Sequence, residues 1–202
     1  VYEDDDILVL NKPTNLVVHP AAGNRTGTLL NGLLFHCPEL INIPRAGIVH
    51  RLDKGTSGVM LIAKNRNMQK KLALLFKNRL VKKTYICLVK GTFKKDRGVI
   101  INKLGKVGSF HGQTMWGADS KGLKAITHWK CLKKGTSHSL LELIPYTGRT
   151  HQLRVHMSEC GHPILGDLQY GREVEFSKKI NRLCLHAYRL AFVHPNTGKL
   201  VQ

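Results

Sequence analysis

The sequence predicts an α+β domain with a mixed or mostly antiparallel sheet. Three observations lead there: short apolar runs rich in β-branched residues recur along the chain, three stretches with helical spacing lie between them, and no repeat or low-complexity linker interrupts them. At 202 residues, the chain is long enough for one domain with a sizeable core. We therefore expect residues 1–202 to form a single domain.

The first third of the chain predicts two strands around a helix. Residues 7–10 form an apolar strand that ends before Pro13, because proline has no N–H to donate to a sheet. Residues 28–35 carry apolar side chains at helical spacing. The unbroken apolar run at 59–63 predicts a buried strand.

Asn65 is a candidate N-cap for a helix that runs to about Asn78. The apolar positions recur at i, i+4, i+7 and i+8 and form one buried stripe: Met68, Leu72, Leu75 and Phe76. The rest of the helix and its exit carry six cations and no acid: Lys70, Lys71, Lys77, Arg79, Lys82 and Lys83. Such a face suits either simple solvation or contacts to phosphate groups.

The second half of the chain predicts further strands at residues 83–91, 125–132 and 139–143. Residues 93–124 show only weak alternation near 99–104, and their structure is left unassigned.

Thr150 is the expected N-cap of a third helix, with Leu153, Met157 and Cys160 facing the core and Gly161 at its end. Three basic residues lie at the start of this helix: Arg149, His151 and Arg154. Cations at a helix N-terminus oppose the macrodipole, so they require a compensating anion, either a phosphate or a nearby carboxylate.

The charge points to a polyanionic partner. Lys and Arg total 32 against 13 acidic residues, which gives a net charge of +19 and a pI of about 10.0. Nucleic acid fits better than a membrane surface, because the cations are spread along the chain and no apolar run approaches the length of a membrane span.

The five cysteines are widely spaced without a Cys-x-x-Cys, which favours a reducing compartment, the cytoplasm. No metal motif is evident, since His151 and His156 are five residues apart.

One polar turn stands out before the central strand. It holds His50, Arg51, Asp53 and Lys54, followed by a Gly-Thr-Ser-Gly segment. A carboxylate flanked by cations on a turn that leads into a core strand is placed to be ionised, exposed and rigid, as a nucleophilic or basic aspartate must be. A turn-forming or salt-bridged aspartate is the alternative.

Around Asp53, the motif His-Arg-Leu-Asp-Lys-x-Thr-Ser-Gly resembles the catalytic signature of the RluA-type pseudouridine synthases. Lys-x-Tyr at Tyr85 resembles the second motif of that family. Gly-Arg-Thr-His-Gln-Leu-Arg-Val-His at 148–156 resembles the third motif, and residues 161–167 with Tyr170 continue it. The opening Asn-Lys-Pro and the closing His194-Pro195 also match, so the resemblance covers nearly the whole chain.

The resemblance implies an RNA pseudouridine synthase that needs no metal or organic cofactor, with a long, bent sheet and an active cleft across its middle. It implies that Asp53 attacks the ribose C1′, or deprotonates the sugar, with Arg154 as its cationic partner. Tyr85 would pack on the uracil and handle a proton, and Arg51 would fill the space of the flipped base or hold its phosphate. The candidate RNA-binding residues are His50, Arg51, Lys54, Arg149 and His151.

Large-subunit ribosomal RNA is the expected substrate, with the enzyme acting as a monomer. A tRNA-acting member of the family is the alternative, and a non-catalytic RNA-binding or ribosome-assembly protein comes next. A ribonuclease is weaker, since no acid–base histidine pair is apparent. Gly55 departs from the family pattern, since many members have an acid there. Many members also have an S4-like RNA-binding domain ahead of this point, and we expect none in this chain.

Overall fold

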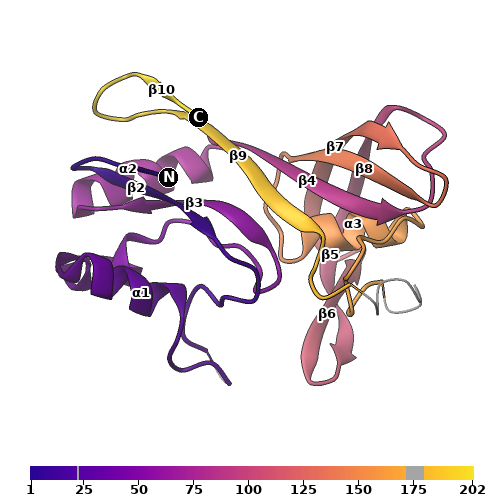
Figure 1. The fold of residues 1–202 in the computed structure, drawn as a ribbon, viewed down its shortest axis with the longest axis horizontal. Helices are drawn as coiled ribbons and strands as arrows, with labels where there is room; N and C mark the ends of the chain where they lie inside the picture. The colour runs from indigo at the N-terminus through magenta and orange to yellow at the C-terminus, as the bar shows by residue number, and fades with distance from the viewer. Residues whose placement is uncertain (22, 172–179) are drawn as a thin grey trace. The chain divides into compact units, whose positions relative to one another are not determined.

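The structure is a computed structural model that describes residues 1–21, 23–171 and 180–202. The chain divides into two compact units (Figure 1). The first unit contains Val1–Lys82 and Ala187–Gln202, and the second contains Lys83–His186.

The first unit combines a sheet with helices. Its strands follow the order β1-β2-β3-β9, and β10 pairs with β9. The β1–β2, β2–β3 and β9–β10 pairs are antiparallel. The strands are β1 (Tyr2–Glu3), β2 (Ile7–Lys12), β3 (Ser57–Ala63), β9 (Leu185–Val193) and β10 (Leu200–Val201). The helices are α1 (Leu29–His36), the 3₁₀ turns η1 (Pro38–Asn42) and η2 (Pro44–Gly47), and α2 (Arg66–Lys77).

Helix α2 covers the core of this unit as the sequence predicts. The Asn65 side chain accepts a hydrogen bond from the Met68 N–H at 2.8 Å, which confirms the N-cap. Met68 and Leu72 are fully buried, and they pack with Ile7 and Leu61 of the two central strands. Burial of this apolar stripe anchors α2 to the sheet, although its outer face consists largely of like charges.

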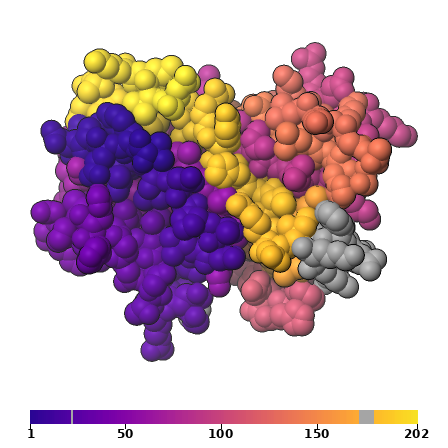
Figure 2. Space-filling view, viewed as in Figure 1, coloured from indigo at the N-terminus to yellow at the C-terminus, as the bar shows by residue number. Residues whose placement is uncertain are grey.

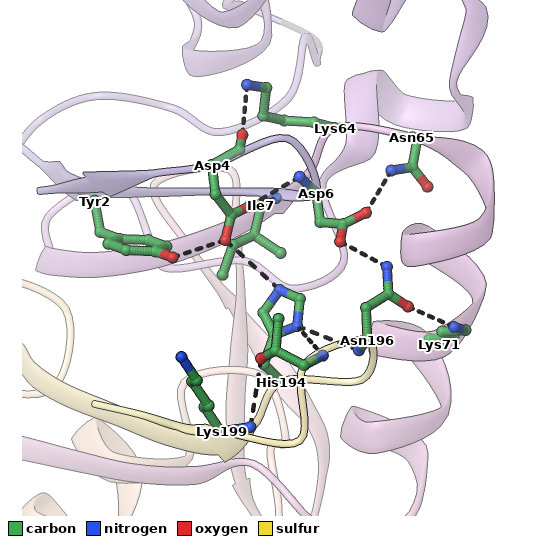
Figure 3. A network of polar contacts seen from close by, with 11 residues as sticks. Tyr2, Asp4, Asp6, Ile7, Lys64, Asn65, Lys71, His194, Asn196 and Lys199 are labelled. Atoms are coloured by element: carbon green, nitrogen blue, oxygen red, sulfur yellow. Dashed lines mark hydrogen bonds and ion pairs between the residues drawn. The ribbon is translucent and has the colours of Figure 1, made fainter.

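Polar contacts join the two ends of the chain within the first unit (Figure 3). The Asp6 carboxylate accepts hydrogen bonds from the side-chain amides of Asn65 and Asn196, and Lys71 donates to Asn196. The buried His194 faces Asp4, with 3.7 Å between Nε2 and the carboxylate. In the space-filling view, the yellow C-terminal residues accordingly lie against the indigo N-terminal residues (Figure 2).

In the part of the second unit that the structure describes, a sheet packs with one helix, α3 (Gln152–Glu159). Its strand order is β9-β4-β8-β7-β5-β6. Only the first two residues of β9 belong to this unit. The pairs β4–β8, β7–β8, β5–β7 and β5–β6 are antiparallel, so the α+β class with a largely antiparallel sheet is confirmed. The strands are β4 (Lys82–Lys90), β5 (Arg97–Phe110), β6 (Gln113–Ala118), β7 (Leu123–Lys134) and β8 (His138–Pro145).

One face of this sheet packs on α3. Leu141 and Leu143 of β8 are fully buried and contact Leu153 and Met157 of the helix. The unassigned region 93–124 contains β5, which at 14 residues is the longest strand described, and Figure 1 shows its hairpin with β6 projecting from the unit. The described helices include none long and apolar enough to cross a membrane.

Two predictions about α3 are wrong. Its N-cap is His151 and not Thr150, and His151 adopts a left-handed conformation with φ of 54° and makes no side-chain cap. Cys160 is exposed instead of facing the core, because the helix ends at Glu159 and Cys160 follows as its C-cap. Within the helix, Val155 and His156 are also buried.

Candidate active site

Asp53 lies in a tight turn immediately before β3. Its backbone carbonyl accepts a hydrogen bond from the Thr56 N–H at 3.1 Å, and its side chain is half-buried. The strand that follows is fixed at Gly58, whose φ of 117° favours glycine and whose position leaves no room for a Cβ against the Ala187 backbone. The carboxylate therefore sits on a turn anchored at its C-terminal end by a buried strand.

A buried lysine holds the other side of this turn. Lys12 is fully buried at the end of β2, and its ammonium donates to three carbonyls: Pro13 at 2.9 Å, Leu16 at 2.9 Å and Lys54 at 3.2 Å. Thr14 adds a hydrogen bond from its hydroxyl to the Gly55 carbonyl at 2.9 Å. Sequence reasoning missed this role, because a lysine beside a proline carries no signal that its partner lies 42 residues away.

His50 fixes the start of the same loop. Its Nε2 accepts a hydrogen bond from the Leu61 N–H at 2.9 Å, so that nitrogen is unprotonated. The ring stacks on Phe76 of α2, with 4.6 Å between centroids. These contacts give His50 a structural part in holding the loop, while its predicted contact with RNA stays a prediction. Arg51 and Lys54 are exposed on either side of Asp53.

Tyr85 belongs to the second unit and lies near the start of β4, opposite Leu143 of β8. It is half-buried and packs against the hydrophobic cluster that contains Leu143, Leu153 and Met157. One side of the ring is thereby fixed by the core, as a side chain that presents an aromatic face to a ligand requires.

Arg154 projects from α3 and is held by a buried carboxylate. Its Nε donates to Asp167 Oδ2 at 2.7 Å and its Nη2 to Asp167 Oδ1 at 2.9 Å. Nη2 also donates to Gln169 at 3.0 Å, and the guanidinium lies 4.8 Å from the centroid of the Tyr170 ring. Of the two anions that the sequence left open for this helix start, the structure provides a carboxylate for Arg154.

The two other basic residues at this helix start bond elsewhere. His151 Nδ1 lies 2.8 Å from the Tyr170 hydroxyl. Arg149 donates from Nε to the Lys124 carbonyl at 3.0 Å, and its backbone N–H donates to the Gln152 side chain. The second unit thus brings Arg149, His151 and Arg154 to one end of α3.

A chain of buried hydrogen bonds fixes α3 on the sheet. The Gln152 side chain donates to Thr127 at 2.9 Å, and Thr127 bonds His156 Nδ1 at 2.9 Å. His156 Nε2 lies 2.7 Å from Asn102 Oδ1, and the Asn102 amide donates onward to Glu159. Because an amide oxygen only accepts, the proton of the neutral imidazole is on Nε2. Burial lowers the pKa of His156 to about 4, so the ring is neutral near pH 7.

The depressed pKa of His156 predicts that stability falls below pH 6.5. The unfolded chain binds the proton with a pKa near the ordinary 6.5 and the folded chain only near 4, so the unfolded state holds more protons between these values. The free energy of unfolding should therefore decrease by about 3 kcal/mol as pH falls through this window, with no contribution above it. Urea unfolding between pH 4.5 and 7 should show a weaker pH dependence for His156→Gln, and an equal dependence would contradict the assignment.

Among residues 1–21, 23–171 and 180–202, the structure contains no group of three or more His, Cys, Asp or Glu residues that could hold a metal ion. The five cysteines are free thiols. The described residues place a carboxylate on an anchored turn in one unit, and an anchored arginine and a tyrosine in the other.

Comparisons with known proteins agree with these features. The sequence model of the RNA pseudouridylate synthase family matches residues 6–159. The ribosomal large subunit pseudouridine synthase D of Neisseria meningitidis serogroup A is 49% identical over 211 residues, covering 100% of this chain and 56% of the relative. The protein of the same name from Haemophilus influenzae is 40% identical and is covered to 65% of its length. The chain thus spans about half to two thirds of these curated relatives.

Solved structures give the same result. Human RNA pseudouridylate synthase domain containing 1 superposes with a TM-score of 0.78 at 32% identity, covering 100% of this chain and 80% of that one. Human RNA pseudouridylate synthase domain containing 4 superposes with a TM-score of 0.75 at 27% identity. From the family match over residues 6–159 and the similarity over the full chain, this protein belongs to the RNA pseudouridylate synthase family.

Proposed function

We propose that this chain is the catalytic part of an RNA pseudouridine synthase that isomerises specific uridines of large-subunit ribosomal RNA. The observation that carries the proposal is the anchored turn that presents Asp53 within the signature motif of the family. The ribosomal RNA substrate is supported by the names of relatives that are 40% to 49% identical over the whole chain. In this proposal, both units work together as one catalytic domain, and the protein acts as a monomer in the cytoplasm.

The proposed reaction detaches uracil from ribose and rejoins it through C5, so it is an isomerisation. In one route, the Asp53 carboxylate forms a bond to C1′ as the C1′–N1 bond breaks. C5 of the rotated uracil then bonds to C1′ as the ester bond to Asp53 breaks, the C5 proton leaves, and N1 takes up a proton in its place. In the other route, Asp53 deprotonates the sugar. Either route requires an ionised carboxylate, a state that a nearby guanidinium favours, and Arg154 is the proposed partner.

Tyr85 is the proposed platform for the uracil, since an aromatic ring fixed by a core on one side can stack a flipped base on the other. Arg51 would fill the space of that base or bind its phosphate. His50, Lys54, Arg149 and His151 complete the proposed set of RNA contacts.

Mapping of pseudouridines tests the proposal. Total RNA from source cells lacking the gene is treated with carbodiimide and mapped by primer extension, with and without wild-type complementation. Loss of sites in large-subunit ribosomal RNA that wild type restores is the expected result. Sites lost in tRNA instead would favour the tRNA-acting alternative, and an unchanged map would refute the enzyme assignment.

The outer face of α2 is a proposed phosphate-binding surface. Residues 54–95 contain twelve Lys and Arg and no acidic residue, and Arg66, Lys70 and Lys77 are exposed on the helix. Arg66 and Lys70 form a like-charge i,i+4 pair, an arrangement that costs a few tenths of a kcal/mol, at roughly 0.2–0.5, in the isolated helix. A polyanion bound to this face would offset that cost.

Neutralising this face should reduce the salt dependence of RNA binding. In Lys70→Gln/Lys77→Gln, we expect the slope of log K against log salt concentration to become shallower by roughly 1.5, because each lost phosphate contact removes about 0.7–0.9. Filter binding of a large-subunit RNA fragment from 50 to 300 mM salt measures it. Lys121→Gln/Lys199→Gln, at two other exposed lysines, is the control for net charge alone. Equal slopes in both double variants would rule out a specific surface on α2.

A further inference from the structure

A short turn, Asp167 to Tyr170, forms side-chain contacts both with the region of α3 and with the β5–β6 hairpin in the second unit. On one side, it contacts Arg154 and His151 of the helix region. On the other side, it contacts β6, since the Gln169 side chain donates to the Thr114 carbonyl at 3.1 Å. The Tyr170 hydroxyl adds a bond by accepting from the Trp116 N–H at 3.1 Å. The same few side chains thus bond both the arginine and the hairpin.

Asp167 is built as an anchor for the guanidinium. Only 1% of its side chain is exposed, and its Oδ1 accepts the backbone N–H groups of Gln169 at 3.0 Å and Tyr170 at 3.1 Å in addition to Arg154 Nη2. Those backbone bonds fix the carboxylate in one orientation. The two parallel hydrogen bonds from Arg154 then fix the plane of the guanidinium. A lysine at position 154 has no planar group that could be oriented in this way.

Gln169 and Tyr170 complete the seat of the arginine. The Gln169 carbonyl oxygen accepts from Arg154 Nη2 at 3.0 Å, while its amide nitrogen reaches β6. The Tyr170 ring supports the guanidinium from its face at 4.8 Å. Any shift of β6 therefore moves two of the three groups that hold Arg154.

We propose that Asp167, Gln169 and Tyr170 are positioning residues for Arg154, and that they couple the placement of the β5–β6 hairpin to the orientation of the guanidinium. The proposal rests on the proposed function, in which Arg154 acts on the reacting carboxylate. A misplacement of about 1 Å at a reacting group can cost on the order of 10²-fold in rate. Because of this coupling, the reaction rate depends on whether β6 keeps its hydrogen bonds to Gln169 and Tyr170.

A double-mutant cycle on the rate constant tests the positioning role. Single-turnover release of tritium from RNA labelled at uridine C5 is measured at saturating enzyme, together with the dissociation constant for the RNA. We expect Asp167→Asn to lower the rate constant by about 10- to 100-fold with a change of less than about twofold in the dissociation constant. Asp96→Asn, which disrupts the exposed ion pair with Lys134 in the same unit, should leave both unchanged.

The Arg154→Ala background separates positioning from support of the fold. If Asp167 acts through Arg154, Asp167→Asn should lower the residual rate by less than about threefold in that background. A loss of tenfold or more there would overturn the proposal. If Asp167→Asn does not fold, Tyr170→Phe replaces it in the same cycle, since it keeps the ring and removes the hydroxyl that bonds Trp116 and His151.

If wild type shows no turnover, the proposed function is refuted but the positioning of Arg154 is not. Hydrogen exchange of the Arg154 side chain tests the positioning without catalysis. The Nε–H resonance of Arg154, assigned by its loss in Arg154→Lys, should be protected from exchange in wild type. Both Asp167→Asn and Gln169→Leu should increase its exchange rate by at least about tenfold. Unchanged exchange in both variants would overturn the proposal even in an active enzyme.

Discussion

Asp53→Asn is expected to lower the rate of pseudouridine formation by a factor on the order of 10⁴ or more while leaving the fold intact. Asparagine matches the shape of aspartate but provides neither a nucleophilic oxygen nor a base. The side chain is half-buried, and the turn is held through main-chain carbonyls that accept from the Thr56 N–H and the Lys12 ammonium, which the substitution leaves in place. The thermal midpoint should therefore stay within a few degrees of that of wild type.

Tritium release from RNA labelled at uridine C5 measures this rate directly, and circular dichroism checks the fold. Asp5→Asn, which neutralises an exposed carboxylate of the same unit, is the matched control and should retain full activity. A rate for Asp53→Asn within about tenfold of wild type would remove Asp53 from the mechanism, because the loss of a nucleophile lowers the rate by much more than that. The binding of RNA should persist in the variant, so this experiment also separates the enzyme from a protein that only binds RNA.

Elements with a strong local pattern were predictable from sequence. The run at 59–63 became the buried core of β3, and Asn65 caps α2 with the predicted stripe facing inward. In each case, the residues that decide the structure lie close to one another along the chain. Local spacing therefore contained the information.

Elements that depend on distant partners were not predictable in this way. The polar sequence of β5 forms a strand because it pairs with β7, from Arg97 opposite Lys130 to Leu104 opposite Leu123. The left-handed conformation of His151 accompanies its contact with Tyr170, 19 residues later, so the cap preference of Thr150 does not prevail.

The candidate site shows the same division. The motif around Asp53 identified the turn, yet its supports come from β2 and α2. The basic start of α3 predicted an anion, and Asp167 supplies one, but no spacing rule pointed to Asp167 as the partner of Arg154. The joint action of Asp53, Tyr85 and Arg154 stays a prediction, and Asp53→Asn tests its central member.

Lys12→Met is expected to destabilise the protein more than any other single change at the Asp53 turn. The substitution keeps a long apolar stem in a fully buried position and removes the ammonium that bonds the carbonyls of Pro13, Leu16 and Lys54. These three hydrogen bonds are partly buried, and at about 1 kcal/mol each their loss should lower the free energy of unfolding by about 3 kcal/mol. In a chain of this size, that loss lowers the thermal midpoint by about 6–12 °C.

The matched control is Lys54→Met. The Lys54 side chain is exposed, and only its backbone carbonyl accepts from Lys12, so this variant keeps that bond and should change stability by no more than about 0.5 kcal/mol. Urea unfolding measures both variants, and the single-turnover rate of Lys12→Met at a temperature where it is folded shows the effect on the turn. A rate lowered by about 10- to 100-fold in folded Lys12→Met would mean that the ammonium sets the position of Asp53. A wild-type rate with reduced stability would mean that Lys12 stabilises the first unit without positioning the carboxylate, and unchanged stability would show that water replaces the ammonium at the three carbonyls.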